Sequence, residues 1–163
     1  MNFESLVAQV GQVLVKHQSM VVTAESCTGG MIAEALTSIG GSTAWFDRAY
    51  ITYSYESKKE MLGVSEMTIQ KKGAVSQQCV EEMALGALQQ SHAKVSVSCS
   101  GIAGPTGASL DKPIGTVWLA WAIQGQDAVI SERFLFSGDR QAVREKTTEA
   151  ALKGILKLLG NLD

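Results

Sequence analysis

The sequence has few of the residues that signal a membrane span, a disulfide framework or a zinc site. No apolar run approaches the ~20 residues that a membrane-spanning helix needs. Three cysteines, Cys27, Cys79 and Cys99, cannot all pair with one another, and no two have the close spacing of a zinc or redox pair. The first twelve residues lack the basic stretch and apolar core of a secretion signal. We therefore expect a soluble, cytoplasmic protein with reduced thiols.

The chain also lacks an excess of basic residues. It has 14 Lys and Arg against 16 Asp and Glu, for a net charge of −2, and the basic residues are spread along its length. Proteins that bind nucleic acid usually gather Lys and Arg on one face. We expect neither a nucleic-acid partner nor a membrane partner, although a single phosphate on a small ligand needs only one local site.

Length and composition predict a single domain over residues 1–163. The hydrophobic fraction of 45% and charged fraction of 18% are typical of a globular protein. A chain of this size can bury about two-thirds of its unfolded surface around one core. No repeat, linker or low-complexity segment divides the sequence.

Hydrophobic periodicity predicts helices alternating with strands. We expect helices over residues 3–17, 31–39, 56–62, 77–90 and from the cap Asp139 to about 159, and strands over 20–24, 45–54, 94–100, 114–123 and 128–136. The last two strands are separated by four residues that include Gly125, which favours an antiparallel hairpin. The order predicts an α/β fold with helices packed around a mixed, partly parallel β-sheet.

Two glycine-containing loops follow predicted strands and are candidate ligand sites. The first places Ser26, Thr28, Gly29 and Gly30 at the start of a helix, where they could hold a nucleophile or an anion. Alternatively, a hydroxyl simply caps the helix and the glycines allow the turn.

The second loop spans residues 101–107 and offers Gly101, Ile102, Ala103, Gly104 and Thr106. It matches neither the phosphate-binding P-loop pattern nor the dinucleotide fingerprint, which argues against ATP and NAD. Its glycines suit close approach of the backbone to a ligand, or a long surface turn.

A nucleophilic serine needs a base, and the chain has only two histidines. His17 and His92 lie at the ends of predicted helices, so we do not expect a Ser-His-Asp triad. Lys58 could serve instead if burial lowers its pKa from ~10.4 toward neutrality. Tyr53 could share the proton relay or hold the lysine in place. The alternative is that Lys58 is a solvated residue beside Lys59.

Two further candidates remain open. Cys27 lies at a helix start, which lowers a thiol pKa, but it has no activating histidine beside it, and a semi-buried structural cysteine is favoured. Arg140 and Arg144 lie four residues apart at the start of the last helix. They could clamp a phosphate or carboxylate, or be ordinary surface arginines.

Seven motifs, in order and with matching spacing from about residue 5 to the end, closely resemble the nicotinamide-nucleotide amidase family, which also forms the C-terminal domain of competence-damage protein CinA. The motifs are Ala24–Gly30, Gly41–Thr43, Tyr53–Ser54 with Lys58, Gly73–Ser76, Gly101–Pro105, Lys112–Val117 and Ser137–Arg140.

The resemblance implies hydrolysis of the carboxamide of nicotinamide mononucleotide to nicotinic acid mononucleotide and ammonia, a step in bacterial pyridine-nucleotide recycling. It implies no metal and no organic cofactor. By motif, Ser26 is the nucleophile, Lys58 the base and Tyr53 a supporting catalytic residue. Larger family members carry an additional N-terminal pyrophosphatase domain. We find no such domain in this sequence and therefore expect the stand-alone form. Family members commonly dimerise, and we expect a homodimer.

The expected substrate-binding set combines both loops with the last helix. It consists of Thr28, Gly29, Gly30, Gly101, Ile102, Ala103, Gly104, Thr106 and Arg140. Backbone N–H groups of either loop could hold the oxyanion, and the Thr28 to Gly30 helix start, Thr106 or Arg140 could bind the substrate phosphate.

One position departs from the family pattern. Many relatives have Asn after the Tyr-Ser pair, whereas this chain has Tyr55. The larger side chain is expected to alter the pocket or the substrate preference. It leaves open a catalytically silent paralogue that binds a pyridine nucleotide as a sensor, and a serine hydrolase of another small amide.

Overall fold

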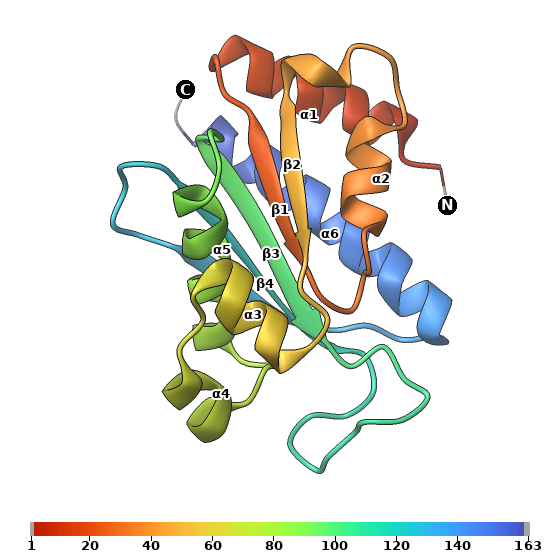
Figure 1. Cartoon of the computed structure of the whole chain (residues 1–163). Helices are drawn as coiled ribbons and strands as arrows, with labels where there is room; N and C mark the ends of the chain where they lie inside the picture. The colour runs from red at the N-terminus through yellow and green to blue at the C-terminus, as the bar shows by residue number, and fades with distance from the viewer. Residues whose placement is uncertain (1, 162–163) are drawn as a thin grey trace.

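In the described part of the chain, five strands form one mixed sheet in the order β2-β1-β3-β4-β5 (Figure 1). The computed structural model describes residues 2–161. The strands are β1 (Val21–Glu25), β2 (Phe46–Ile51), β3 (Val95–Gly101), β4 (Thr116–Ile123) and β5 (Ile130–Leu135). β1 pairs in parallel with β2 and β3, whereas β4 runs antiparallel to β3 and β5. The predicted α/β class, the partly parallel sheet and the final hairpin are thereby confirmed.

Helices cover both faces of the sheet (Figure 1). One face carries α1 (Glu4–Lys16), α2 (Met31–Thr37) and α6 (Arg140–Gly160), and the other carries α3 (Tyr55–Leu62), α4 (Glu66–Lys72) and α5 (Gln77–Gln89). A short 3-10 helix, η1 (Ser42–Ala44), precedes β2. None of the helices within residues 2–161 is long and apolar enough to cross a membrane.

Successive strand residues point alternately into two apolar cores. Val21, Val97 and Leu119 pack under α1, α2 and α6, whereas Val22 and Ala120 pack under α5. All five residues of β1 are buried. Because β1 lies between β2 and β3, the chain that leaves its carboxyl end emerges between the two helical layers.

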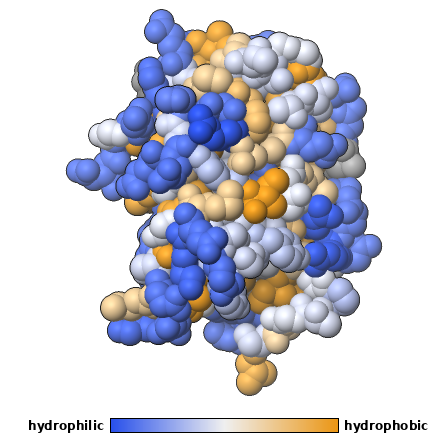
Figure 2. Space-filling view, in the orientation of Figure 1, coloured by the Kyte–Doolittle hydropathy of each residue, from blue (hydrophilic) through white to orange (hydrophobic). Residues whose placement is uncertain are grey.

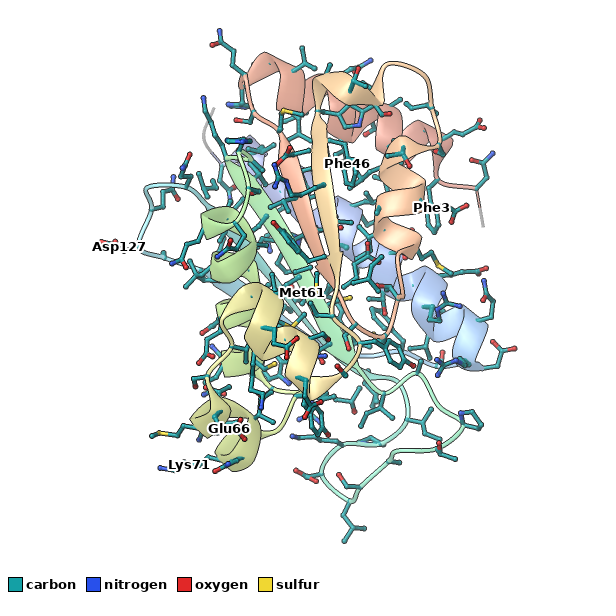
Figure 3. All side chains as sticks on the ribbon, in the orientation of Figure 1. Phe3, Phe46, Met61, Glu66, Lys71 and Asp127 are labelled. Carbon is teal, nitrogen blue, oxygen red and sulfur yellow. The ribbon has the colours of Figure 1, made fainter. Side chains whose placement is uncertain are left out.

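The structure differs from the sequence prediction around α4, which was not foreseen. Ser65 caps this helix by accepting a hydrogen bond from the N–H of Thr68, and the helix ends at Gly73. Its Glu66 and Lys71 point to solvent, as does Asp127 at the tip of the turn between β4 and β5 (Figure 3). A short, polar helix has too few apolar residues to produce the spacing by which a helix is predicted from sequence.

Candidate active site

The site lies where the carboxyl ends of the parallel strands β1, β2 and β3 meet. The helix that follows β1 packs on one face of the sheet, and the helix that follows β2 packs on the other. Chain segments diverging to opposite faces leave a crevice at the strand ends, which is where α/β proteins bind ligands. Ser26 directly follows β1, and Lys58 lies in the first turns of α3.

Ser26 and Lys58 meet in this crevice although 32 residues separate them in the sequence. The Lys58 Nζ lies 3.0 Å from Ser26 Oγ and 2.6 Å from the carbonyl oxygen of Thr52. Lys58 is 1% exposed and Ser26 is 8% exposed. Burial in a poorly solvated site disfavours the ammonium form and lowers the pKa of Lys58. The pair therefore has the contact and the electrostatics that a serine nucleophile and a lysine base require.

Local sequence fixes where α3 begins and so places Lys58. The predicted strand over 45–54 ends earlier, at Ile51, because the chain then turns to enter the helix. Ser54 and Ser57 form a capping box, with the Ser57 N–H donating to Ser54 Oγ at 3.1 Å. Lys58 comes one residue later and points back under the strand end.

Glu25, which sequence reasoning did not single out, has a fully buried carboxylate at the end of β1. Five donors surround it. They are Thr23 Oγ1 at 3.1 Å, Thr28 Oγ1 at 2.6 Å, and the N–H groups of Gly30, Ile32 and Ala33 at 3.0, 3.1 and 2.9 Å. The start of α2 is thus occupied by the chain's own anion. An acidic residue between a buried strand and a helix start was the available signal.

Other groups of the first loop are engaged in the turn itself. The N–H of Gly29 donates to the carbonyl of Ser26 at 3.1 Å, and the N–H of Met31 donates to the carbonyl of Thr28 at 3.3 Å. Gly30 has a φ of +102°, a conformation that a residue with a side chain adopts only under strain. The loop is therefore a rigid support for Ser26.

The second loop is fixed at its base and open farther out. The N–H of Ile102 donates to the carbonyl of Thr116 at 2.8 Å, and the N–H of Gly115 donates back to the carbonyl of Ile102 at 2.7 Å. Ala103 and Gly104 are buried, whereas Thr106 is exposed. At the bottom of Figure 2, the segment over 102–115 ends in a hydrophobic projection.

The first turns of α6 connect the two loops. Arg140 donates from Nη1 to the carbonyl of Gly104 at 2.8 Å and from Nη2 to the Tyr53 hydroxyl at 3.0 Å. Arg144 Nη2 donates to the carbonyl of Thr28 at 2.8 Å. Tyr53 and Tyr55 are 61% and 56% exposed. The structure thus brings Tyr53 to Arg140, and it places Arg140 beside the second loop and Arg144 beside the first loop, which carries Ser26.

Comparison with known proteins identifies the family. A family model described as the CinA C-terminal domain matches residues 3–159. The chain belongs to the CinA C-terminal domain family. It is 52% identical over 145 residues to the nicotinamide-nucleotide amidohydrolase PncC of Escherichia coli strain K12, covering 89% of this chain and 87% of that protein. It is 51% identical over 154 residues to the protein of the same name from Pseudomonas putida, covering 94% and 95%.

A solved structure of the family has the same fold. The competence/damage inducible protein CihA from Agrobacterium tumefaciens superimposes with a TM-score of 0.93 at 40% identity, covering 98% of this chain and 96% of that one. The resemblance inferred from the seven motifs is therefore confirmed.

Within this CinA domain, Cys27 lies beside Ser26 but in a different environment. It is buried in the core under α1, α2 and α6. A hydrogen bond with Cys99 and burial raise the pKa of Cys27 well above its usual value, and the nearby charge of Glu25 adds to this effect. Cys27 therefore stays a protonated thiol, which is a poor nucleophile.

A cavity of about 480 Å³ lies elsewhere in the CinA domain, between β5 and α6. Trp121, Phe134 and Leu158 are among the residues that line it, and Ser26 and Lys58 are not. The candidate active site is identified by the chemistry of its side chains and not by the size of this cavity.

Proposed function

We propose that this chain hydrolyses the carboxamide of nicotinamide mononucleotide to nicotinic acid mononucleotide and ammonia. The name of the Escherichia coli and Pseudomonas putida relatives supports the reaction. The observation that carries a Ser/Lys mechanism is the 3.0 Å contact between Lys58 Nζ and Ser26 Oγ in a site where burial favours the neutral amine.

In the first half-reaction, neutral Lys58 accepts the hydroxyl proton of Ser26 as Ser26 Oγ attacks the amide carbon. The transfer is direct, since the two atoms are already in contact. The resulting tetrahedral intermediate carries its negative charge on the former carbonyl oxygen. Protonated Lys58 then gives its proton to the amide nitrogen, the C–N bond breaks, and ammonia leaves an ester on Ser26.

In the second half-reaction, water replaces ammonia. Neutral Lys58 takes a proton from the water as its oxygen attacks the ester carbon, and the returning proton goes to Ser26 Oγ as the C–O bond breaks. The products are the carboxylic acid and the regenerated Ser26 and Lys58 pair. No cofactor takes part in this scheme.

The oxyanion and the phosphate need donors that the fold has not already committed. In the first loop, N–H groups of Gly29, Gly30 and Met31 serve the turn and Glu25. We therefore place the oxyanion against the N–H groups of Ala103 and Gly104. The phosphate is placed against Arg140, with Arg144 and Thr106 beside it, because each guanidinium has five N–H donors and keeps some of them beyond the bonds to Gly104, Tyr53 and Thr28. Thr28 to Gly30 then form a wall of the site.

Ammonia release by the purified protein tests this proposal, with Ser26→Ala as the control for contaminating amidases. Nicotinamide mononucleotide should be strongly preferred over nicotinamide riboside and free nicotinamide, since a phosphate-reading site loses its charged contacts with the latter two. Equal rates on all three would favour hydrolysis of another small amide. No release by folded protein, together with tight binding of the mononucleotide, would favour the silent sensor and direct attention to Tyr55.

We propose a homodimer in the cytoplasm. Light scattering of the purified protein measures the mass of the particle against the 17.3 kDa chain, and fractionation of the cells measures the location.

A further inference from the structure

Glu25 lies between both members of the proposed catalytic pair: its buried carboxylate holds the turn that carries Ser26, and its backbone carbonyl leads through Thr52 to Lys58. Its side chain accepts hydrogen bonds from Thr28 and from the first N–H groups of α2, which lie just after Ser26. Its backbone carbonyl accepts the N–H of Thr52 at 2.8 Å, and the carbonyl of Thr52 in turn accepts Lys58 Nζ at 2.6 Å. We propose that Glu25 is a positioning residue that fixes the distance between Ser26 Oγ and Lys58 Nζ. This inference rests on the proposed function of that pair.

The geometry explains why a buried acid occupies this position. Ser26 lies on a turn between a strand and a helix, and such a turn is anchored only if both sides are held. Glu25 holds the helix side through three N–H groups that have no partner within the helix, and the strand side through Thr23 on β1. The turn cannot shift relative to either element without breaking these bonds.

The chemistry of the five partners makes the carboxylate hard to replace. Two hydroxyls and three N–H groups all direct hydrogens at Glu25, and an ionised carboxylate only accepts. A glutamine has one accepting oxygen and an NH2 group that donates. With its oxygen toward Thr28, Gly30 and Ile32, its NH2 group would face the N–H of Ala33, so that one contact becomes repulsive.

The same contacts separate positioning from substrate binding. Glu25 is fully buried and surrounded by its own chain, so it does not touch the substrate. A change at Glu25 should therefore reduce the turnover number much more than it alters the affinity for the mononucleotide. Displacing a reacting group by about 1 Å can cost on the order of 100-fold in rate.

The test compares Glu25→Gln with Glu34→Gln, which also removes one negative charge near the start of α2 but from an exposed side chain. We expect Glu25→Gln to lower kcat by about 10- to 100-fold and to leave KM within about two-fold of wild type. The midpoint of the kcat/KM pH profile should stay in place, since Lys58 remains buried. Glu34→Gln should leave both constants within about two-fold.

The rate at which a fluorophosphonate phosphonylates Ser26 Oγ with loss of fluoride, followed by intact-protein mass spectrometry, gives a readout that does not require the substrate to be nicotinamide mononucleotide. Glu25→Gln should react more slowly than wild type. If wild type reacts but releases no ammonia, the substrate assignment fails while the comparison of variants still tests Glu25. If wild type does not react at all, both the nucleophile and this inference are overturned.

Several results would overturn the role of Glu25. A folded Glu25→Gln protein with kcat and phosphonylation rate close to wild type would do so, as would an equal loss in Glu34→Gln. A raised KM with unchanged kcat would assign Glu25 to binding instead. If Glu25→Gln does not fold, Thr28→Val removes the 2.6 Å bond and keeps the carboxylate, and its loss must again appear in kcat.

Discussion

Burial of Lys58 makes a prediction about the rate that can be worked out from its ionisation. Only the neutral amine can accept the proton of Ser26, and an unperturbed lysine with a pKa of ~10.4 is neutral in only about one molecule in 2,500 at pH 7. Desolvation lowers the pKa of Lys58 in the folded protein, so its neutral fraction is larger. We expect kcat/KM to rise about tenfold per pH unit and then level off, with a midpoint below 10.5.

The same shift has a cost in stability with a definite sign. Between the folded pKa of Lys58 and its unfolded value, the unfolded chain binds more protons, so the free energy of unfolding rises with pH in this window. Below the window both states are protonated and the folded state bears the full cost of a buried ammonium. Lys58→Met removes this cost, estimated at several kcal/mol, and loses two hydrogen bonds worth about 1 kcal/mol each. We expect a net gain on the order of 1 kcal/mol at pH 7.

Urea unfolding at pH 7 and pH 9, together with ammonia release, measures both effects. The stability advantage of Lys58→Met should shrink as the pH rises toward 10.5, and its activity should fall by at least about 100-fold. Lys58→Arg is the matched control, because a guanidinium keeps the charge at every accessible pH and should be both inactive and less stable. A Lys58→Met enzyme with a tenth of wild-type activity, or a stability difference that does not change with pH, would refute the reasoning.

Three further changes test other parts of the site. Cys27→Ala should retain most of the ammonia release and Ser26→Ala almost none, and equal inactivity of the two would contradict the assignment of the nucleophile. Gly86→Ala should lower the free energy of unfolding by about 1–3 kcal/mol in urea titrations, because a Cβ there would lie 1.9 Å from the carbonyl oxygen of Leu62 at the end of α3. Helix propensity alone predicts that Gly86→Ala raises the free energy of unfolding by about 1 kcal/mol. The sign of the measured change therefore decides between the two effects. Arg140→Lys should raise KM for the mononucleotide about tenfold and leave the riboside nearly unaffected. An equal effect of Arg140→Lys on both substrates would show that Arg140 does not bind the phosphate.

The fold could be predicted from sequence because short-range sequence patterns determine its helices and strands. The strand over Val95–Gly101 and the helix over Gln77–Gln89 lie within a residue of the predicted ranges. Apolar periodicity, an N-cap at Ser76 and another at Asp139 are short-range features that do not depend on the rest of the chain.

The site could be predicted only where a motif or a family resemblance supplied it. The spacing of Ser26 and Lys58 says nothing about a contact across 32 residues, since that contact depends on which strands are neighbours. In the sequence, Glu25 is one more polar residue near the end of a strand. Its hydrogen bonds with the N–H groups of Ile32 and Ala33 depend on how the turn closes, which the sequence alone does not show. The commitment of backbone N–H groups, which decides where an anion can bind, is likewise a property of the folded loop.

The choice between two adjacent candidate nucleophiles follows from where the turn after β1 directs their side chains. Ser26 and Cys27 are neighbours in the turn that follows β1, and their side chains enter opposite sides of the sheet. Ser26 points toward the layer of α3, where Lys58 is buried, and Cys27 points into the opposite core, where Cys99 and Glu25 raise its pKa. A thiol is a strong nucleophile only as a thiolate, and burial beside Cys99 and Glu25 disfavours the thiolate of Cys27. The proposal of Ser26 as the nucleophile therefore rests on the fold as much as on the residue type.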